Sequence, residues 1–229
     1  MVLELLLANH PTDCLACARN LNCELQALAA DLGVKTPRFS GQQRHYTIDK
    51  GNAFIVRDNE KCILCGRCVR VCQELQVCNV LGFMNRGFET KLATAFDTPT
   101  HESECVFCGA CVAACPVGAL TEKVLSQAGR PDKTVRTTCP FCGVGCNFDL
   151  NVKDGKIVGV TSSPDSPVNG RLLCVKGRFG TDYVHSPHRL TTPLLRKNGR
   201  LEPVSWNEAL DFTAARLSAL KSERGPDSI

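Results

Sequence analysis

Two stretches of the sequence share one cysteine spacing: Cys62-Ile-Leu-Cys65-Gly-Arg-Cys68-Val-Arg-Val-Cys72 and Cys105-Val-Phe-Cys108-Gly-Ala-Cys111-Val-Ala-Ala-Cys115-Pro116. Both read C-x2-C-x2-C-x3-C, which is the ligand run of bacterial [4Fe–4S] proteins, and the second copy has the proline that often follows it. Three thiolates spaced two residues apart can bind three corners of one cubane from a single loop. The fourth cysteine begins a segment that leads away from that loop.

The fourth cysteine of each run is predicted to bind the cluster of the other run, as in two-cluster ferredoxins. One cluster is then held by Cys62, Cys65, Cys68 and Cys115. The second is held by Cys105, Cys108, Cys111 and Cys72.

Zinc and disulfides are the alternative uses of such cysteines. Structural zinc sites use C-x2-4-C pairs separated by a longer gap, rather than four cysteines within eleven residues. Disulfide frameworks are typical of small secreted proteins. Two tandem copies of the run favour iron–sulfur clusters over both.

Two further cysteine groups flank the runs. His10, Cys14, Cys17 and Cys23 have the pattern H-x3-C-x2-C-x5-C, in which the histidine ring can supply the fourth ligand to a cluster or to zinc. Cys139, Cys142, Cys146 and Cys174 form a C-x2-C-x3-C group with a distant fourth member. A hairpin of 147–152 and 156–160, turning at Asp154-Gly155, would bring Cys174 back to the other three.

The ligand count is consistent with four cubanes. The chain has 16 cysteines, and all except Cys78 fall into these four groups, where His10 supplies the sixteenth ligand. Cys78 is the one rival to His10, and we interpret it as a small buried apolar residue because it lies in another part of the chain. The count alone does not choose between them.

Composition narrows the class of protein. The formal net charge of the 229-residue chain is +4, and cluster charges of about −2 each, or about −1 with a histidine ligand, would bring it to roughly −3. Lys and Arg are scattered, so a nucleic-acid partner is not expected. The start of the chain lacks the features of a secretory signal, and no membrane span or nucleotide-binding glycine loop is predicted. Cluster-bound cysteines indicate a reducing compartment, which we take to be the cytoplasm of an anaerobe.

Several elements can be predicted from pattern. Residues 2–9 and 24–32 are expected to be helices, 53–56 a strand, 77–88 a hairpin or small strands, and 122–133 a linker. Ser205-Trp-Asn-Glu208 is a capping box that begins a helix over 206–223 with one buried apolar face. Gly225-Pro226 is expected to lead into a strand.

The motifs together resemble a known family. The segment from His10 to Cys23 is similar to the His-ligated cluster segment of complex I G subunits, iron-only hydrogenases and NAD(P)-linked formate dehydrogenases, and the paired runs resemble their ferredoxin module. The segment from Cys139 to Cys174, continuing as Val175-Lys176-Gly-Arg-Phe-Gly180, resembles the N-terminal iron–sulfur domain of Mo or W bis-pterin oxidoreductases. Their order matches the alpha subunit of cytosolic formate dehydrogenases.

This resemblance implies an α+β chain of small iron–sulfur modules in series. They are a His-ligated helical segment (1–33), a connector (34–50), a two-cluster ferredoxin-like domain (51–125), a linker (126–134), a β-rich bis-pterin-oxidoreductase [4Fe–4S] domain (135–187) and the start of an α/β pterin-binding domain (188–229). By the same resemblance, Lys176 would lie between the fourth cluster and a pterin cofactor, whereas the residues alone also allow an ordinary solvated lysine.

The implied function is electron transfer through four [4Fe–4S] clusters. Electrons would pass between a Mo or W bis-pterin site outside these residues and NAD(P)- or ferredoxin-linked iron–sulfur or flavin subunits. The resemblance places no catalytic residue in this chain. Two alternatives are a stand-alone relay subunit of a hydrogenase or electron-bifurcating complex, and a zinc-binding structural protein.

Overall fold

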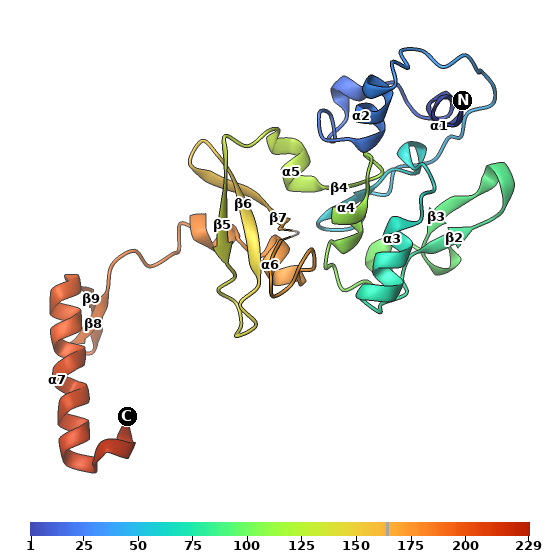
Figure 1. Cartoon of the computed structure of the whole chain (residues 1–229). Helices are drawn as coiled ribbons and strands as arrows, with labels where there is room; N and C mark the ends of the chain where they lie inside the picture. Colours follow the sequence, from blue (N-terminus) through green and yellow to red (C-terminus); the bar gives the residue numbers. More distant parts are fainter. Residues whose placement is uncertain (164) are drawn as a thin grey trace. The chain divides into compact units, whose positions relative to one another are not determined.

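The computed structural model describes residues 1–163 and 165–229, with all their side chains except those of Ser126 and Gln127. The chain divides into two compact units, Met1–Asp182 and Tyr183–Ile229. All sixteen predicted cluster ligands lie in the first unit. The elements are shown in Figure 1.

Short helices alternate with short strands along the chain. The helices are α1 (Val2–Ala8), α2 (Glu24–Asp31), α3 (Arg67–Arg70), α4 (Ala110–Ala114), α5 (Lys123–Ala128), α6 (Val175–Phe179) and α7 (Trp206–Arg224). The strands are β1 (Ile55–Arg57), β2 (Gly82–Met84), β3 (Lys91–Ala93), β4 (Leu120–Glu122), β5 (Lys133–Thr138), β6 (Asn147–Lys153), β7 (Lys156–Ser162), β8 (Leu194–Lys197) and β9 (Arg200–Pro203).

The two cysteine runs fold alike. In each run a glycine in the left-handed region, Gly66 (φ 73°) or Gly109 (φ 69°), ends the ligand loop and begins helix α3 or α4. A residue without a Cβ adopts this conformation at little cost, so the loop can turn sharply into the helix. Strands β1 and β4 pair antiparallel and tie the two ends of the module together. Strands β2 and β3 form a hairpin in the insert, but its second strand, Lys91–Ala93, lies beyond the predicted 77–88, where Gly87–Glu89 instead form a 3-10 turn.

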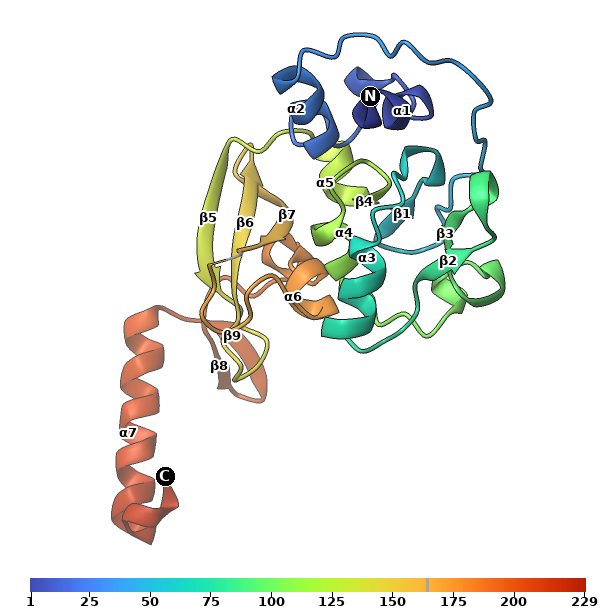
Figure 2. The same ribbon diagram turned by 45° about the vertical axis from the view of Figure 1, so that its right-hand side comes forward.

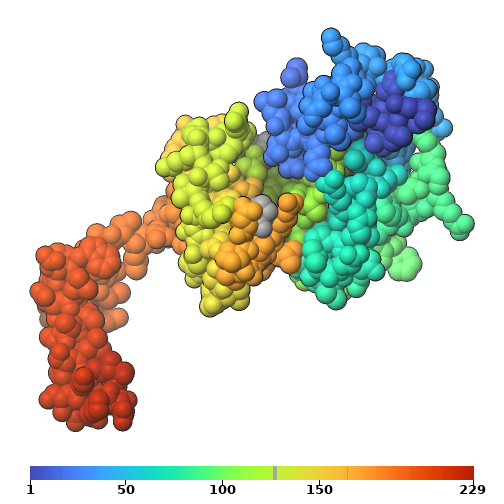
Figure 3. All heavy atoms as spheres, in the orientation of Figure 1, coloured from blue at the N-terminus to red at the C-terminus, as the bar shows by residue number. Residues whose placement is uncertain are grey.

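One apolar core joins the N-terminal segment to this module. Leu25 of α2 is buried together with Ile55, Leu92 and Val117. The amide of Glu24 donates to the carbonyl of Pro116 at 2.9 Å. The N-terminal segment, in blue, therefore lies against the ferredoxin-like module (Figure 3).

Strands β5, β6 and β7 form an antiparallel sheet in that order. The β6–β7 turn contains Asp154 (φ 49°) and Gly155 (φ 73°), both in the left-handed region that a two-residue hairpin loop requires. The predicted hairpin is confirmed. Both views place α6 between this sheet and helices α3 and α4 (Figure 2).

The segment expected to be a linker contains a helix. Helix α5 begins directly after β4, and its Leu125 packs on β7 at Gly159, where a Cβ would lie 3.2 Å from the leucine side chain. The ammonium of Lys153 donates to the carbonyl of Ala128 at 2.7 Å and holds the end of the helix. Sequence pattern could not reveal this packing surface, because it comes from a strand about thirty residues away.

The second unit consists of the β8–β9 hairpin and helix α7. The Ser205 hydroxyl accepts from the Glu208 amide at 3.2 Å, so the predicted N-cap is confirmed. The expectation of a buried apolar face is wrong for the described residues 183–229: Trp206, Leu210 and Phe212 are exposed. A helix buries such side chains only against another element. The strand expected after Gly225 is also wrong, since Pro226–Ser228 form a 3-10 turn.

Candidate iron–sulfur sites

Each predicted cluster set of the ferredoxin-like module lines its own cavity. One cavity is lined by Cys62, Cys65, Cys68 and Cys115. The other is lined by Cys72, Cys105, Cys108 and Cys111. The structure thus brings the fourth cysteine of each run to the loop of the other run, across the contact between α3 and α4. We call these cavities the first and second ferredoxin sites.

Burial makes these thiols poor acids in the absence of metal. Desolvation, with added repulsion from Cys62, Cys115 and Cys65, raises the pKa of Cys68 to about 12. Burial also raises the pKa of Cys111, and the nearby Cys108 adds to the effect. Because cysteine binds iron as the thiolate, cluster assembly must release these protons, and the free energy of metal binding becomes folding free energy.

The N-terminal site is more open. Cys14 is exposed, while Cys17 and Cys23 are half-buried. His10 is half-buried, and desolvation, followed by the charge of Lys61, lowers its pKa, which favours the neutral imidazole that a metal requires. A Cβ on Gly118 would lie 2.6 Å from the sulfur of Cys17, so this site lies directly against the chain segment that follows Cys115.

The fourth site is assembled at one end of the three-stranded sheet. Burial raises the pKa of Cys146, and charge repulsion from Cys139, Cys142 and Cys174 raises it further. The four predicted ligands therefore lie close together. The return of Cys174 depends on Asn169: its side-chain amide donates to the carbonyls of Leu172 (2.7 Å) and Asn147 (3.1 Å) and ties the returning loop to β6.

Two other residues from the sequence analysis can now be placed. Lys176 is exposed on α6, two residues after Cys174. Cys78 lines the second ferredoxin site beside its four predicted ligands, and its amide donates to the carbonyl of Cys72 at 2.9 Å. Cys78 is therefore not placed to replace His10, and it gives the second site a fifth thiol.

Two arginines that sequence reasoning missed connect neighbouring sites. Arg19, between Cys17 and Cys23, donates to the carbonyl of Cys115 at 2.7 Å. Arg178 of α6 is almost completely buried and donates through Nε to the carbonyl of Cys108 at 3.0 Å. Its Nη1 contacts Glu122 at 3.2 Å, and its Nη2 donates to Ser162.

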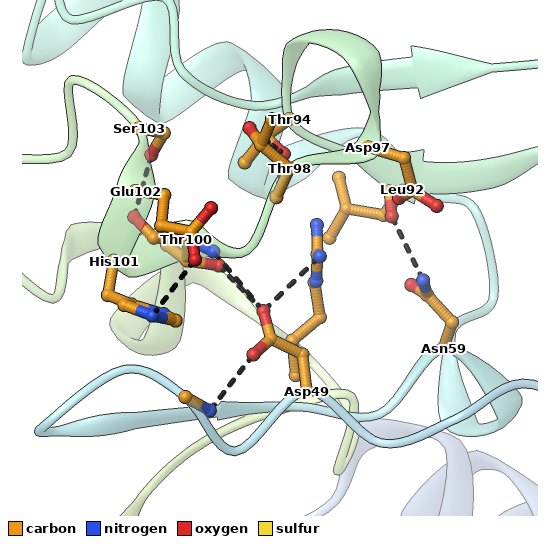
Figure 4. Close-up of polar contacts among 12 residues, drawn as sticks. Asp49, Asn59, Leu92, Thr94, Asp97, Thr98, Thr100, His101, Glu102 and Ser103 are labelled. Atoms are coloured by element: carbon orange, nitrogen blue, oxygen red, sulfur yellow. Dashed lines mark hydrogen bonds and ion pairs between the residues drawn. The ribbon is translucent and has the colours of Figure 1, made fainter.

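A third arginine faces the second ferredoxin site. Arg57 ends β1 on the buried face of the strand, and its side chain is 8% exposed. Its Nη2 lies 3.2 Å from Oδ2 of Asp49, and the same oxygen accepts from the Thr100 hydroxyl at 3.0 Å. Figure 4 shows Asp49 and Thr100 in this network.

The buried N–H groups of Arg57 indicate whether an anionic group fits this cavity. Its Nε and Nη1 are buried, and neither has a hydrogen-bond partner within the described residues. Arg57 lines the cavity that holds the five cysteines. A buried cation with unsatisfied N–H groups is costly, and sulfur atoms of a cluster would satisfy them. The residues therefore fit an anionic iron–sulfur cluster.

The described residues contain no group of three or more His, Cys, Asp or Glu side chains gathered around one point, as a single zinc ion would need. A cubane does not require its ligands to meet at one point, because each thiolate binds a different iron at its own corner. No helix in the described part of the chain has the length and apolarity to cross a bilayer.

Family models match the chain in the predicted order. Residues 1–38 match the NADH-ubiquinone oxidoreductase-G iron-sulfur binding region, and residues 52–121 match the ferredoxin-like domain of NADH-quinone oxidoreductase subunit 3. Residues 132–186 match the molybdopterin oxidoreductase Fe4S4 domain, and residues 189–229 match molybdopterin oxidoreductase. The chain is thus similar, module by module, to the iron–sulfur parts of molybdopterin oxidoreductases and complex I G subunits, and the predicted resemblance is confirmed.

Curated relatives are similar in sequence over nearly the whole chain. A G-type subunit of the NADH-quinone oxidoreductase of Rhizobium meliloti is 37% identical over 97% of this chain and 26% of its own length. The alpha subunit of the NADPH-Fe(3+) oxidoreductase of Geobacter sulfurreducens is 36% identical over 100% of this chain and 26% of its own length. A putative formate dehydrogenase of Bacillus subtilis is 36% identical over 99% of this chain and 28% of its own length.

The chain therefore spans about a quarter of the length of these relatives. Among solved structures, an NAD+-reducing [NiFe]-hydrogenase is 28% identical, with a TM-score of 0.47 over 53% of this chain and 52% of the hydrogenase chain.

Proposed function

We propose that this chain carries electrons through four [4Fe–4S] clusters as the iron–sulfur part of a formate dehydrogenase. The electrons would pass between a Mo or W bis-pterin site outside these residues and an NAD(P)- or ferredoxin-linked subunit in a reducing cytoplasm. When bound, each cluster exchanges one electron. The predicted ligands are the sixteen residues of the sequence analysis, with His10 completing the N-terminal site. Lys176 would lie between the fourth cluster and the pterin cofactor.

The observation that carries this proposal is the linear succession of the four sites. The N-terminal site adjoins the first ferredoxin site through the Cys17–Gly118 approach and the Arg19–Cys115 hydrogen bond. The two ferredoxin sites adjoin across α3 and α4, where Cys68 lies near enough to Cys111 to influence its pKa. Arg178 joins the second ferredoxin site to the helix that follows Cys174. A relay needs such adjacency, whereas separate structural metal sites do not.

The test begins with cluster content. The full chain, purified without oxygen, should contain about sixteen iron and sixteen sulfide atoms and show the broad visible absorption of thiolate-bound iron. Zinc in place of iron would contradict the proposal. In the complex from the native source, Mo or W should copurify, and formate should reduce the clusters.

A second function is favoured by the equal similarity to NADH- and NADPH-linked relatives, at 37% and 36% identity. In this case the chain is a relay in an NAD(P)H-linked complex, such as a hydrogenase or electron-bifurcating assembly. Reduction of the clusters by NAD(P)H or hydrogen but not by formate, without copurified Mo or W, would support it over the first.

A further inference from the structure

We infer that Arg57 donates hydrogen bonds to the group bound in the second ferredoxin site and raises that group's reduction potential. The inference rests on the proposed function, because it requires a [4Fe–4S] cluster at Cys72, Cys105, Cys108 and Cys111. Neither the spacing of the cysteines nor the family models assign this role.

The position of Arg57 follows from its strand. Side chains alternate across a β-strand, so Ile55 and Arg57 share one face of β1, and both line the second ferredoxin site. The strand is paired on both sides at this point: Arg57 is opposite Leu120 of β4 and forms an isolated bridge with Asp49. The backbone of Arg57 is therefore fixed by pairing on both sides, and the pleat of the strand directs the side chain towards the cavity.

Asp49 fixes the guanidinium from one side only. The carboxylate is itself bound by the Gly51 amide at 3.1 Å and by Thr100. Burial works to raise the pKa of Asp49, but these hydrogen bonds and the charge of Arg57 together lower it, so the carboxylate is ionised. It uses Nη2 of Arg57, whereas Nε and Nη1 remain buried and without a partner in the described part of the protein.

The unused donors match the chemistry of the proposed occupant. A cubane with four thiolates carries a charge of about −2 and gains another negative charge on reduction. The step adds one electron, and no bond is made or broken. A buried cation and N–H groups directed at sulfur stabilise the more negative state, and such contacts are among the factors that set cluster potentials. Arg57 thus makes the second cluster easier to reduce than the same cubane without it.

Charge substitutions on the two sides of the pair give opposite predictions. Arg57→Gln removes the cation and leaves Asp49 uncompensated, so the midpoint potential of the second cluster should fall. The reduction equilibrium constant should drop about tenfold or more, which is the usual effect of losing a charge-assisted hydrogen bond. Asp49→Asn leaves the cation without its counter-charge, so the midpoint should rise.

The measurement is an anaerobic redox titration of the full chain, followed by electron paramagnetic resonance. The signal of the second cluster is assigned as the one that Cys105→Ser removes. Arg136→Gln and Asp149→Asn serve as matched controls, since they break an exposed Arg–Asp pair (3.1 Å) on the β5–β6 sheet and should leave the midpoint unchanged.

A purely structural role for Arg57 would overturn the inference. In that case both substitutions would lower stability or iron content, and the midpoint would not shift in opposite directions. If Arg57→Gln does not fold, Arg57→Lys and Asp49→Asn carry the test. Arg57→Lys keeps the charge but loses the guanidinium donors, so its midpoint should fall below that of wild type. An unshifted midpoint in Asp49→Asn refutes the inference. Absence of the second-cluster signal from the wild-type chain would instead refute the proposed function.

Discussion

At the scale of single residues, the choice of ligand decides the properties of each site. In the proposed N-terminal cluster, His10 would replace a thiolate with a neutral imidazole, which would remove one negative charge from that cluster. We expect His10→Cys to retain iron and to lower the midpoint potential of the N-terminal cluster, because the added thiolate disfavours the reduced state. His10→Ala should lose about four of about sixteen iron atoms. Redox titration and iron analysis test both, and an unchanged midpoint in His10→Cys would argue that His10 is not a ligand.

Cys78 and Cys72 provide a second test at this scale. Both line the second ferredoxin site, but only Cys72 belongs to the ligand run. Cys72→Ser should remove or convert the second cluster, whereas Cys78→Ser should leave the iron content and the resonance signal unchanged. The opposite result would mean that Cys78 is the fourth ligand and that the predicted set must be revised.

At the scale of elements, the two cysteine runs differ in what surrounds their glycines. A Cβ on Gly109 would lie 2.2 Å from the Cδ of buried Arg178, whereas a Cβ on Gly66 would lie 2.9 Å from the Nη1 of exposed Arg70. Both positions have positive φ, so alanine costs about 1–2 kcal/mol at either one. Gly109→Ala should cost more than Gly66→Ala, because Arg178 cannot move without breaking its buried hydrogen bonds.

Thermal unfolding of the cluster-loaded variants measures this difference. Equal losses of stability in Gly66→Ala and Gly109→Ala would show that the Arg178 side chain can move at little cost. In that event the tight connection between α6 and the second ferredoxin site would not be needed for stability.

Helix α1 is attached to the connector by one ion pair. Arg38 donates to both carboxylate oxygens of Glu4, at 2.7 and 2.6 Å. This side-chain hydrogen bonding lowers the pKa of Glu4 from 4.5 to about 2 against the opposing effect of burial. A lowered carboxylate pKa stabilises the folded state fully above pH 4.5, and the contribution is lost as the pH falls towards 2.

Glu4→Gln should therefore increase hydrogen exchange in α1 and in residues 34–50 at neutral pH, with little change in the ferredoxin-like core. Arg136→Gln, which breaks an exposed pair elsewhere, is the matched control. Unchanged exchange in Glu4→Gln would mean that core contacts of Leu3, Leu6 and Leu7 hold the helix without the ion pair.

At the scale of the whole molecule, the division into two units separates cluster binding from the C-terminal segment. All predicted ligands lie in the first unit, Met1–Asp182, and none lies in the second unit, Tyr183–Ile229. Limited trypsin digestion should cleave at exposed Arg189 and release the C-terminal part, while the larger fragment keeps its iron. Loss of iron together with cleavage would show that the second unit contributes to a cluster site. Mass spectrometry and iron analysis of the fragments distinguish these outcomes.

The sequence alone determined what depends on short spacing. A cubane can be bound by cysteines two or three residues apart, so both ferredoxin runs could be found from spacing alone. The exchange of their fourth cysteines stays a prediction, and the two cavities that the cysteines line are consistent with it. The Asp154-Gly155 hairpin and the Ser205 cap were equally local, and they are confirmed.

Only the tertiary structure decided which distant groups meet. Arg57 and Arg178 look like ordinary charged residues in the sequence, because nothing in their neighbourhood along the chain marks them as buried. Arg178 lies 70 residues from the cysteine whose carbonyl it binds, and Arg57 reaches its cavity through strand pairing with β4. Their roles depend on long-range packing. Burial removes water from the charged guanidinium group, which must then form its hydrogen bonds with groups inside the protein.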